Sequence, residues 1–129
     1  MTKLNNIACK ILENGKGILA ADESTATMTK RLESVNVVSN VENRILFREN
    51  LFTSKGMSKF IGGVILYDET IKQKTSDGKK VPELLADMGS LPGIKVDTGA
   101  KQLAGSPEEK ITEGLDGLRE RLKEYSALG

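Results

Sequence analysis

The sequence contains no histidine and no tryptophan, and Cys9 is its only cysteine. Without histidine, the chain has neither the commonest general base near neutral pH nor the commonest zinc ligand. Catalytic groupings of the Ser-His-Asp or Cys-His type are therefore excluded within these residues, and acid–base chemistry falls to Asp, Glu, Lys and Tyr. A single cysteine permits no internal disulfide, which fits a reducing compartment. Cys9 lies on the apolar face of the first predicted helix, so we expect it to be a small core or interface residue.

An excess of charge of one sign and a long apolar run are also missing. Lys and Arg total 19 against 18 Asp and Glu, a net charge of +1. This balance offers no general attraction to nucleic acid or to an anionic membrane, so we expect neither as a partner. No stretch approaches the roughly 20 apolar residues of a membrane span. Residues 1–6 lack the apolar segment of a signal peptide. We therefore expect a cytoplasmic protein.

The spacing of apolar residues predicts helices that alternate with strands. Residues 18–21 and 60–67 are continuously apolar, as buried parallel strands are. The predicted elements are, in chain order, a helix over 4–12, a strand over 17–22, a helix over 25–35, a helix that Ser39 caps with Glu42 three residues on, a strand over 60–67, a helix over 82–88, a strand over 93–97 and a main C-terminal helix over 115–128.

The stretch before the last helix is ambiguous. Residues 106–109 (Ser-Pro-Glu-Glu) have the spacing of a helix capping box with proline at the first helical position. However, Gly114 and Gly117 would each weaken a helix by about 1 kcal/mol relative to alanine. We therefore place the main helix at 115–128.

Repeated strand–helix units predict an α/β fold with a parallel sheet and right-handed crossovers. Acidic residues follow each predicted strand: Asp22 the first, Asp68 and Glu69 the second, and Asp97 the third. In α/β barrels the chemistry lies at these carboxyl ends. A whole barrel needs about 250 residues and eight strands, and three strands cannot close on themselves. The chain is therefore either a fragment or an open sheet that covers its edges by assembly.

Asp22 and Lys95 are the candidate site residues on the strands. Alternation along residues 94–97 puts Lys95 and Asp97 on one side of the strand and the two apolar residues on the other. A lysine that points into a barrel needs an anionic partner, such as Asp22, Asp97 or a bound phosphate. The alternatives are a solvated edge lysine for Lys95 and a helix cap for Asp22.

A second candidate group lies at the start of the helix that follows the first strand. Ser24, Thr27, Lys30 and Arg31 cluster there. Hydroxyls and free N–H groups at a helix N-terminus form a site for phosphate oxygens, and arginine can add a bidentate contact. The alternative is ordinary capping beside a solvated basic face.

Four blocks of this sequence resemble class I, Schiff-base-forming fructose-bisphosphate aldolases. They are GKGILAADEST at 15–25, IGGVILYDET at 61–70, GIKVD at 93–97 and GLDGL at 114–118, in the family's order and at similar spacing. The resemblance implies a TIM (β/α)8 barrel, of which this chain would hold the first three strand–helix units. Residues 1–129 would then be the N-terminal part of a single aldolase barrel domain, incomplete at its C-terminus.

The resemblance also implies a reaction and an assembly. The family reversibly cleaves fructose 1,6-bisphosphate to dihydroxyacetone phosphate and glyceraldehyde 3-phosphate in glycolysis and gluconeogenesis. A lysine forms an imine with the ketose, so no metal or other cofactor is expected. The partner is a small sugar phosphate, and family members usually form homo-oligomers, often tetramers.

The family's site residues map onto this chain in part. Asp22 and Lys95 match catalytic positions, and Lys95 also contacts the sugar's hydroxyls or phosphate. Ser24, Thr27 and Arg31 match positions that contact the phosphorylated substrate. Ala26 stands where many members have glycine, and Thr27 where many have serine.

No residue here matches the Schiff-base lysine, so we expect the chain alone to be inactive. One alternative is a truncated, non-catalytic product with weak sugar-phosphate binding or an interaction role. Another is an unrelated barrel enzyme that uses Asp22 and Asp97 with a divalent metal.

Overall fold

The computed structural model describes residues 2–129. The helices and strands are, in chain order, α1 (Lys3–Ile11), the short 3-10 turn η1 (Glu13–Gly15), β1 (Gly17–Ala21), α2 (Thr25–Glu33), α3 (Val41–Phe52), α4 (Met57–Phe60), β2 (Ile61–Leu66), α5 (Asp68–Ile71), α6 (Val81–Asp87), β3 (Leu91–Ile94), β4 (Gly99–Leu103), β5 (Ser106–Glu113) and α7 (Leu118–Leu128). None of the helices within residues 2–129 combines the length and apolar character needed to cross a bilayer.

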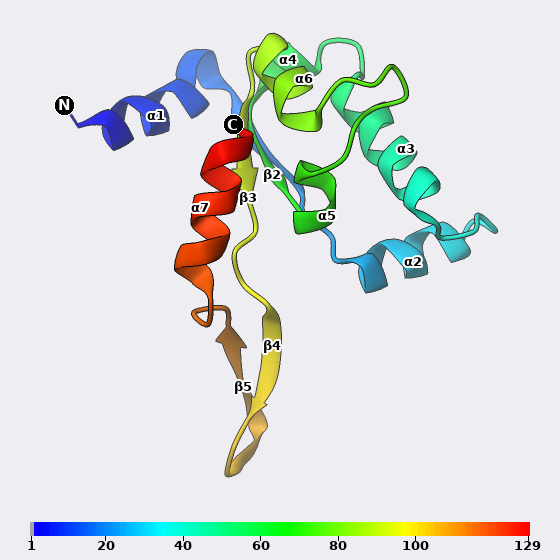
Figure 1. The fold of residues 1–129 in the computed structure, drawn as a ribbon, viewed down its shortest axis with the longest axis vertical. Coiled ribbons are helices and arrows are strands. Elements are labelled where there is room, and N and C mark those ends of the chain that lie inside the picture. The colour runs from blue at the N-terminus through cyan, green and yellow to red at the C-terminus, as the bar shows by residue number, and fades with distance from the viewer. Residues whose placement is uncertain (1) are drawn as a thin grey trace.

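Strands β1, β2 and β3 form one parallel sheet in that order. The three predicted strands are therefore confirmed as parallel and adjacent. In the register, Ala21 pairs with Leu66, and Leu66 pairs with Ile94. Figure 1 shows α3, α5 and α6 to one side of the strands and α7 alongside β3, while the hairpin of β4 and β5 extends away from the body.

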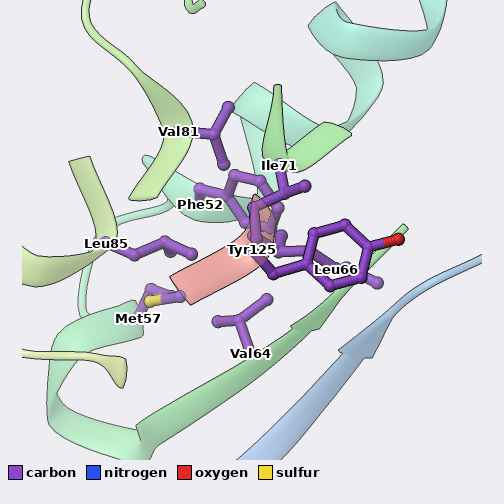
Figure 2. Close-up of a cluster of buried hydrophobic side chains, with 9 residues drawn as sticks. Phe52, Met57, Val64, Leu66, Ile71, Val81, Leu85 and Tyr125 are labelled. Atoms are coloured by element: carbon purple, nitrogen blue, oxygen red, sulfur yellow. The ribbon is translucent and has the colours of Figure 1, made fainter. Parts of the chain in front are cut away.

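The core lies on the helix-covered face of this sheet. Val64 and Leu66 of β2 are buried there against Phe52 of α3. Tyr125 of α7 joins the same cluster, and Figure 2 shows its ring beside Leu66. Ile18 of β1 points to the opposite face and is 54% exposed. The sheet therefore has one face packed by the described helices and one that is open.

Helix α1 packs against the start of β2 through a glycine. A Cβ atom added to Gly62 would lie 2.7 Å from the carbonyl carbon of Ile11 and closer still to its oxygen. The Ile11 side chain lies over the next residue, Gly63. No residue of α1 is fully buried, and Cys9 is exposed, so it is not a core residue among residues 2–129; an interface position for this cysteine remains a prediction. The close approach at Gly62 and Gly63 involves the last turn of α1.

The stretch between β3 and α7, whose structure was ambiguous from the sequence, forms a hairpin that was not predicted. Residues 106–109 do not cap a helix. They begin β5, which pairs antiparallel with β4. Gly105 in the tight connection has φ +79°, a value that glycine adopts without strain and that closes a hairpin. The main helix is confirmed from Leu118 onward, after Gly117 at φ +64°.

Other boundaries move by a few residues. Asn40, not Ser39, caps α3, because its Oδ1 accepts the N–H of Asn43 at 2.7 Å. Ser39 instead shares a 2.7 Å hydrogen bond with Thr29 of α2. The third strand is Leu91–Ile94 rather than 93–97. Helix α2 ends at Glu33 rather than at residue 35.

Candidate active site

The carboxyl ends of the three parallel strands bring the predicted site residues together. Asp22, Tyr67 and Lys95 each come one residue after a paired position of the register, so they form the next row beyond the sheet. All three line one cavity of about 520 Å³. The other lining residues are Ala20, Glu23, Ser24, Thr27, Arg31, Asp97, Thr98 and Gly99. The residues predicted from the family resemblance, Asp22, Ser24, Thr27, Arg31 and Lys95, therefore all border this cavity.

Asp22 is partly exposed at the end of β1. The alternative that it caps α2 is wrong, because Ser24 is the cap. No side-chain hydrogen bond or ion pair within residues 2–129 restrains its carboxylate. Its backbone is instead held from behind by Arg48 of α3, whose Nε donates to the carbonyl of Ala21 at 3.3 Å and whose Nη2 donates to that of Glu23 at 2.5 Å.

Lys95 emerges just past β3 on the cavity side. Its backbone N–H donates to the Leu66 carbonyl at 2.9 Å, which continues the ladder by one residue. Ile94 packs toward the helices, as the alternation predicted. The lysine Nζ forms an ion pair with Asp97, so Asp97 is the anionic partner among the three that the sequence left open. A hydrogen bond from Lys95 lowers the pKa of Asp97 below its usual range.

The hydroxyls at the start of α2 face the same cavity. Ser24 Oγ accepts the N–H of Thr27 at 3.4 Å and lies 3.2 Å from the Thr27 hydroxyl. The helix N-terminus thus presents two hydroxyls and further backbone N–H groups in one place. Ala26 lies inside α2, and it is not among the non-glycine residues with positive φ in residues 2–129. The backbone at this position therefore does not require the glycine that many family members carry.

Arg31 reaches the cavity edge from the last turn of α2 and forms an ion pair with Glu23. Its side chain is 54% exposed, whereas that of Glu23 is only 12% exposed. Lys30 is exposed and is not among the lining residues. Glu23 was not predicted as a site residue. The sequence pattern that could have identified Glu23 is its position directly after Asp22 and two helical turns before the basic residues at the end of α2.

A layer of buried charge supports the cavity from the side of α3. Arg44 donates to both oxygens of Glu69, from Nε at 2.9 Å and from Nη2 at 2.6 Å. The hydrogen bond from Arg44 lowers the pKa of Glu69, and the same bond raises that of Arg44. Glu69 is therefore an ion-pair partner within the fold. Burial lowers the pKa of Arg48, whose side chain is fully buried.

In the described part of the chain, no group of three or more Asp, Glu or Cys side chains is arranged to hold a metal ion. The site consists of carboxylates, one lysine, one arginine, a phenol and hydroxyls. Such a set can bind a hydroxylated, negatively charged molecule and move protons at its oxygens.

Comparison with known proteins identifies the family. The family model described as glycolytic, fructose-bisphosphate aldolase class-I, matches residues 3–129. The chain belongs to the class I fructose-bisphosphate aldolase family. A probable class 1 aldolase of Xanthomonas campestris pv. campestris is 52% identical over 127 residues, which are 98% of this chain and 38% of the relative. The Schistosoma mansoni fructose-bisphosphate aldolase is 53% identical over 127 residues, 35% of its length.

A solved aldolase structure has the same fold over this region. The Plasmodium falciparum fructose-bisphosphate aldolase, crystallised with TRAP and a small-molecule inhibitor, superposes with a TM-score of 0.93 at 48% identity. The match covers 98% of this chain and 36% of that one. The chain therefore spans a little over a third of the length of the aldolases that it matches.

Proposed function

We propose that these residues form one side of the active site of a class I fructose-bisphosphate aldolase. The reaction is the reversible cleavage of fructose 1,6-bisphosphate to dihydroxyacetone phosphate and glyceraldehyde 3-phosphate, in glycolysis and gluconeogenesis. The observation that carries the proposal is the row of Asp22, Tyr67 and Lys95 at the carboxyl ends of three parallel strands, in a chain that belongs to this family.

In this proposal, residues 1–129 are the N-terminal part of one barrel domain. The open face of β1, where Ile18 is 54% exposed, is the inner face that further strands would cover. Parallel sheets are normally covered on both faces, which supports the barrel over a free-standing open sheet. The assembled protein would be a cytoplasmic homo-oligomer, as the family resemblance implies.

Asp22 acts as a proton-transfer group at the substrate hydroxyls and during imine formation. Its carboxylate borders the cavity and is partly exposed, so a bound sugar can reach it. General acid–base catalysis needs such a group within hydrogen-bond distance of the proton that moves.

Lys95 binds the sugar's hydroxyls or phosphate instead of forming the imine. Its Nζ forms an ion pair with Asp97, so this nitrogen is already engaged with a carboxylate. An imine-forming amine must be free to attack the carbonyl carbon of the ketose. The Schiff-base lysine is therefore expected outside residues 1–129.

A phosphate of the substrate binds at the start of α2. Ser24, Thr27 and the backbone N–H groups there can donate to its oxygens. Arg31 can add a charged contact if it exchanges its Glu23 partner for the phosphate. This exchange would bring the arginine from the cavity edge onto the ligand.

The proposal is tested with the full-length protein and an assay for released triose phosphates. We expect cleavage of fructose 1,6-bisphosphate that survives EDTA and a covalent adduct when dihydroxyacetone phosphate is trapped with borohydride. Asp22→Asn should lower kcat by roughly 10²–10⁴-fold. The matched control is Asp87→Asn, because Asp87 is exposed and paired with Lys79 outside the cavity.

Loss of cleavage in EDTA, or cleavage with no trapped adduct, would contradict the imine mechanism. An unmodified protein with no cleavage at all would favour a non-catalytic role with weak sugar-phosphate binding.

A further inference from the structure

Arg48 is a fully buried arginine whose N–H groups are directed at backbone rather than at a carboxylate. Its Nε donates to the Ala21 carbonyl at 3.3 Å, and its Nη2 donates to the Glu23 carbonyl at 2.5 Å. These two carbonyls lie on either side of Asp22. The nearest carboxylate oxygen of Glu23 is 3.9 Å from Nη2, at the limit of an ion pair.

This arrangement is a costly way to stabilise a core. A buried charge needs compensation, and Nη1 of Arg48 has no hydrogen-bond partner in residues 2–129. Arg44, one turn earlier on α3, shows the ordinary solution, because both oxygens of Glu69 accept from it. An apolar side chain at position 48 would pack against the same core without this cost. The contacts of Arg48 therefore point to a role in geometry.

We propose that Arg48 is a positioning residue for Asp22. It holds the peptide unit that precedes Asp22 and the peptide unit that follows Glu23, and so fixes the direction in which the Asp22 carboxylate leaves β1. This matters because no side-chain contact in the described residues restrains that carboxylate. The inference rests on the proposed function, in which Asp22 transfers protons.

The chemistry of the arginine side chain suits this role. A guanidinium presents several N–H groups in a rigid plane, so one side chain can donate to two carbonyls at fixed relative positions. Lysine carries one ammonium on a flexible stem and cannot hold two carbonyls at fixed relative positions. Arg48→Lys therefore keeps the positive charge and removes the paired hydrogen bonds to the Ala21 and Glu23 carbonyls.

The experiment uses the full-length protein, fructose 1,6-bisphosphate and four variants: Arg48→Lys, Asp22→Asn, the double variant and Arg44→Lys. We expect Arg48→Lys to lower kcat by about ten- to a hundredfold, since small misplacements of catalytic groups cost up to about 10² in rate. KM should change much less, because ground-state binding is retained. In the Asp22→Asn background, the same substitution should lower kcat by no more than about twofold, as expected for residues that act as one unit.

Arg44→Lys is the matched control, because Arg44 is also a buried arginine of α3 but contacts Glu69 and Ser39 rather than the backbone around Asp22. It should lower the melting temperature with kcat retained. If Arg48→Lys does not fold, Arg48→Gln is the second variant, since its amide can still donate to one carbonyl.

Equal losses of kcat from Arg48→Lys in the two backgrounds would overturn the inference and leave the aldolase proposal intact. Full activity of the single variant, or a matching kcat loss in Arg44→Lys, would also overturn it. An unmodified protein that does not cleave the bisphosphate would overturn the proposed function and this inference with it.

Discussion

Replacement of Gly62 by alanine should detach α1 from the sheet. The added Cβ would lie 2.7 Å from the carbonyl carbon and 3.2 Å from the Cα of Ile11, and closer still to the carbonyl oxygen. Real Cβ atoms essentially never come within 3.0 Å of another heavy atom of this kind. The obstruction is helix backbone, which cannot rotate away as a flexible side chain can.

The loss of folding free energy can be estimated for two cases, with α1 docked on the sheet and with α1 undocked. If α1 stays docked, overpacking costs typically about 1–3 kcal/mol. If α1 lifts off, the contact of Ile11 with Gly63 is lost; full burial of such a side chain is worth about 1.5–3 kcal/mol, and Ile11 is only partly buried. The protein takes the cheaper route, so we expect a loss of about 1–1.5 kcal/mol and undocking of α1.

The assay is hydrogen exchange by mass spectrometry on peptides that cover residues 3–11, together with urea unfolding of the full-length protein. A cost of this size corresponds to about a tenfold loss of amide protection in α1. The control is Gly17→Ala, because the nearest atom to its added Cβ is 4.0 Å away and its φ is not positive. That control should be neutral or stabilising by about 0.4–1 kcal/mol. If both variants show the same rate of amide exchange in α1, this helix does not pack on β2 through Gly62.

Three further predictions concern the site and its support. Arg31→Ala should weaken binding of fructose 1,6-bisphosphate by about tenfold or more, and binding of fructose 1-phosphate less, because a charge-assisted contact is worth about 1.5–3 kcal/mol; equal losses in titration calorimetry would show that Arg31 does not select the second phosphate. Residues 1–129 alone, treated with dihydroxyacetone phosphate and borohydride, should give no adduct by mass spectrometry above a lysine-rich control protein; a stoichiometric adduct on Lys95 with bisphosphate cleavage would contradict this. Arg44 holds the pKa of Glu69 below its usual range, so this stabilisation is present above the ordinary glutamate pKa of about 4.3 and is lost as pH falls through the lower folded value. Glu69→Gln should therefore lower the melting temperature at pH 7 and have much less effect near pH 3, and a pH-independent difference would argue against the ion pair.

The sheet and much of the site could be predicted because the signals are local. The continuous apolar runs at 18–21 and 60–67 favour buried strands, and alternation placed Lys95 and Asp97 on one side. The roles of the predicted site residues remain predictions.

The hairpin and the buried arginines could not be predicted in the same way. Residues 106–109 satisfy the local pattern of a helix cap, and only their pairing with β4 decides otherwise. On α3, the apolar Val41 is 48% exposed, whereas the charged Arg44 and Arg48 are buried. Which charged side chains are buried depends on partners such as Glu69, which lies far away in the sequence.

The place of Tyr125 in the core has a consequence for the order in which the protein can fold. The residues that line the cavity all lie between positions 20 and 99. Tyr125, whose ring packs beside Leu66 and whose hydroxyl donates to Asp68 Oδ1 at 2.8 Å, belongs to α7. During synthesis the site residues therefore leave the ribosome before the helix that completes their support. Until α7 arrives, Leu66 and Ile71 lack part of their cover, and the nascent sheet exposes apolar surface on both faces. The emerging chain is thus open to non-native association after the cavity-lining residues are made and before residue 125 docks.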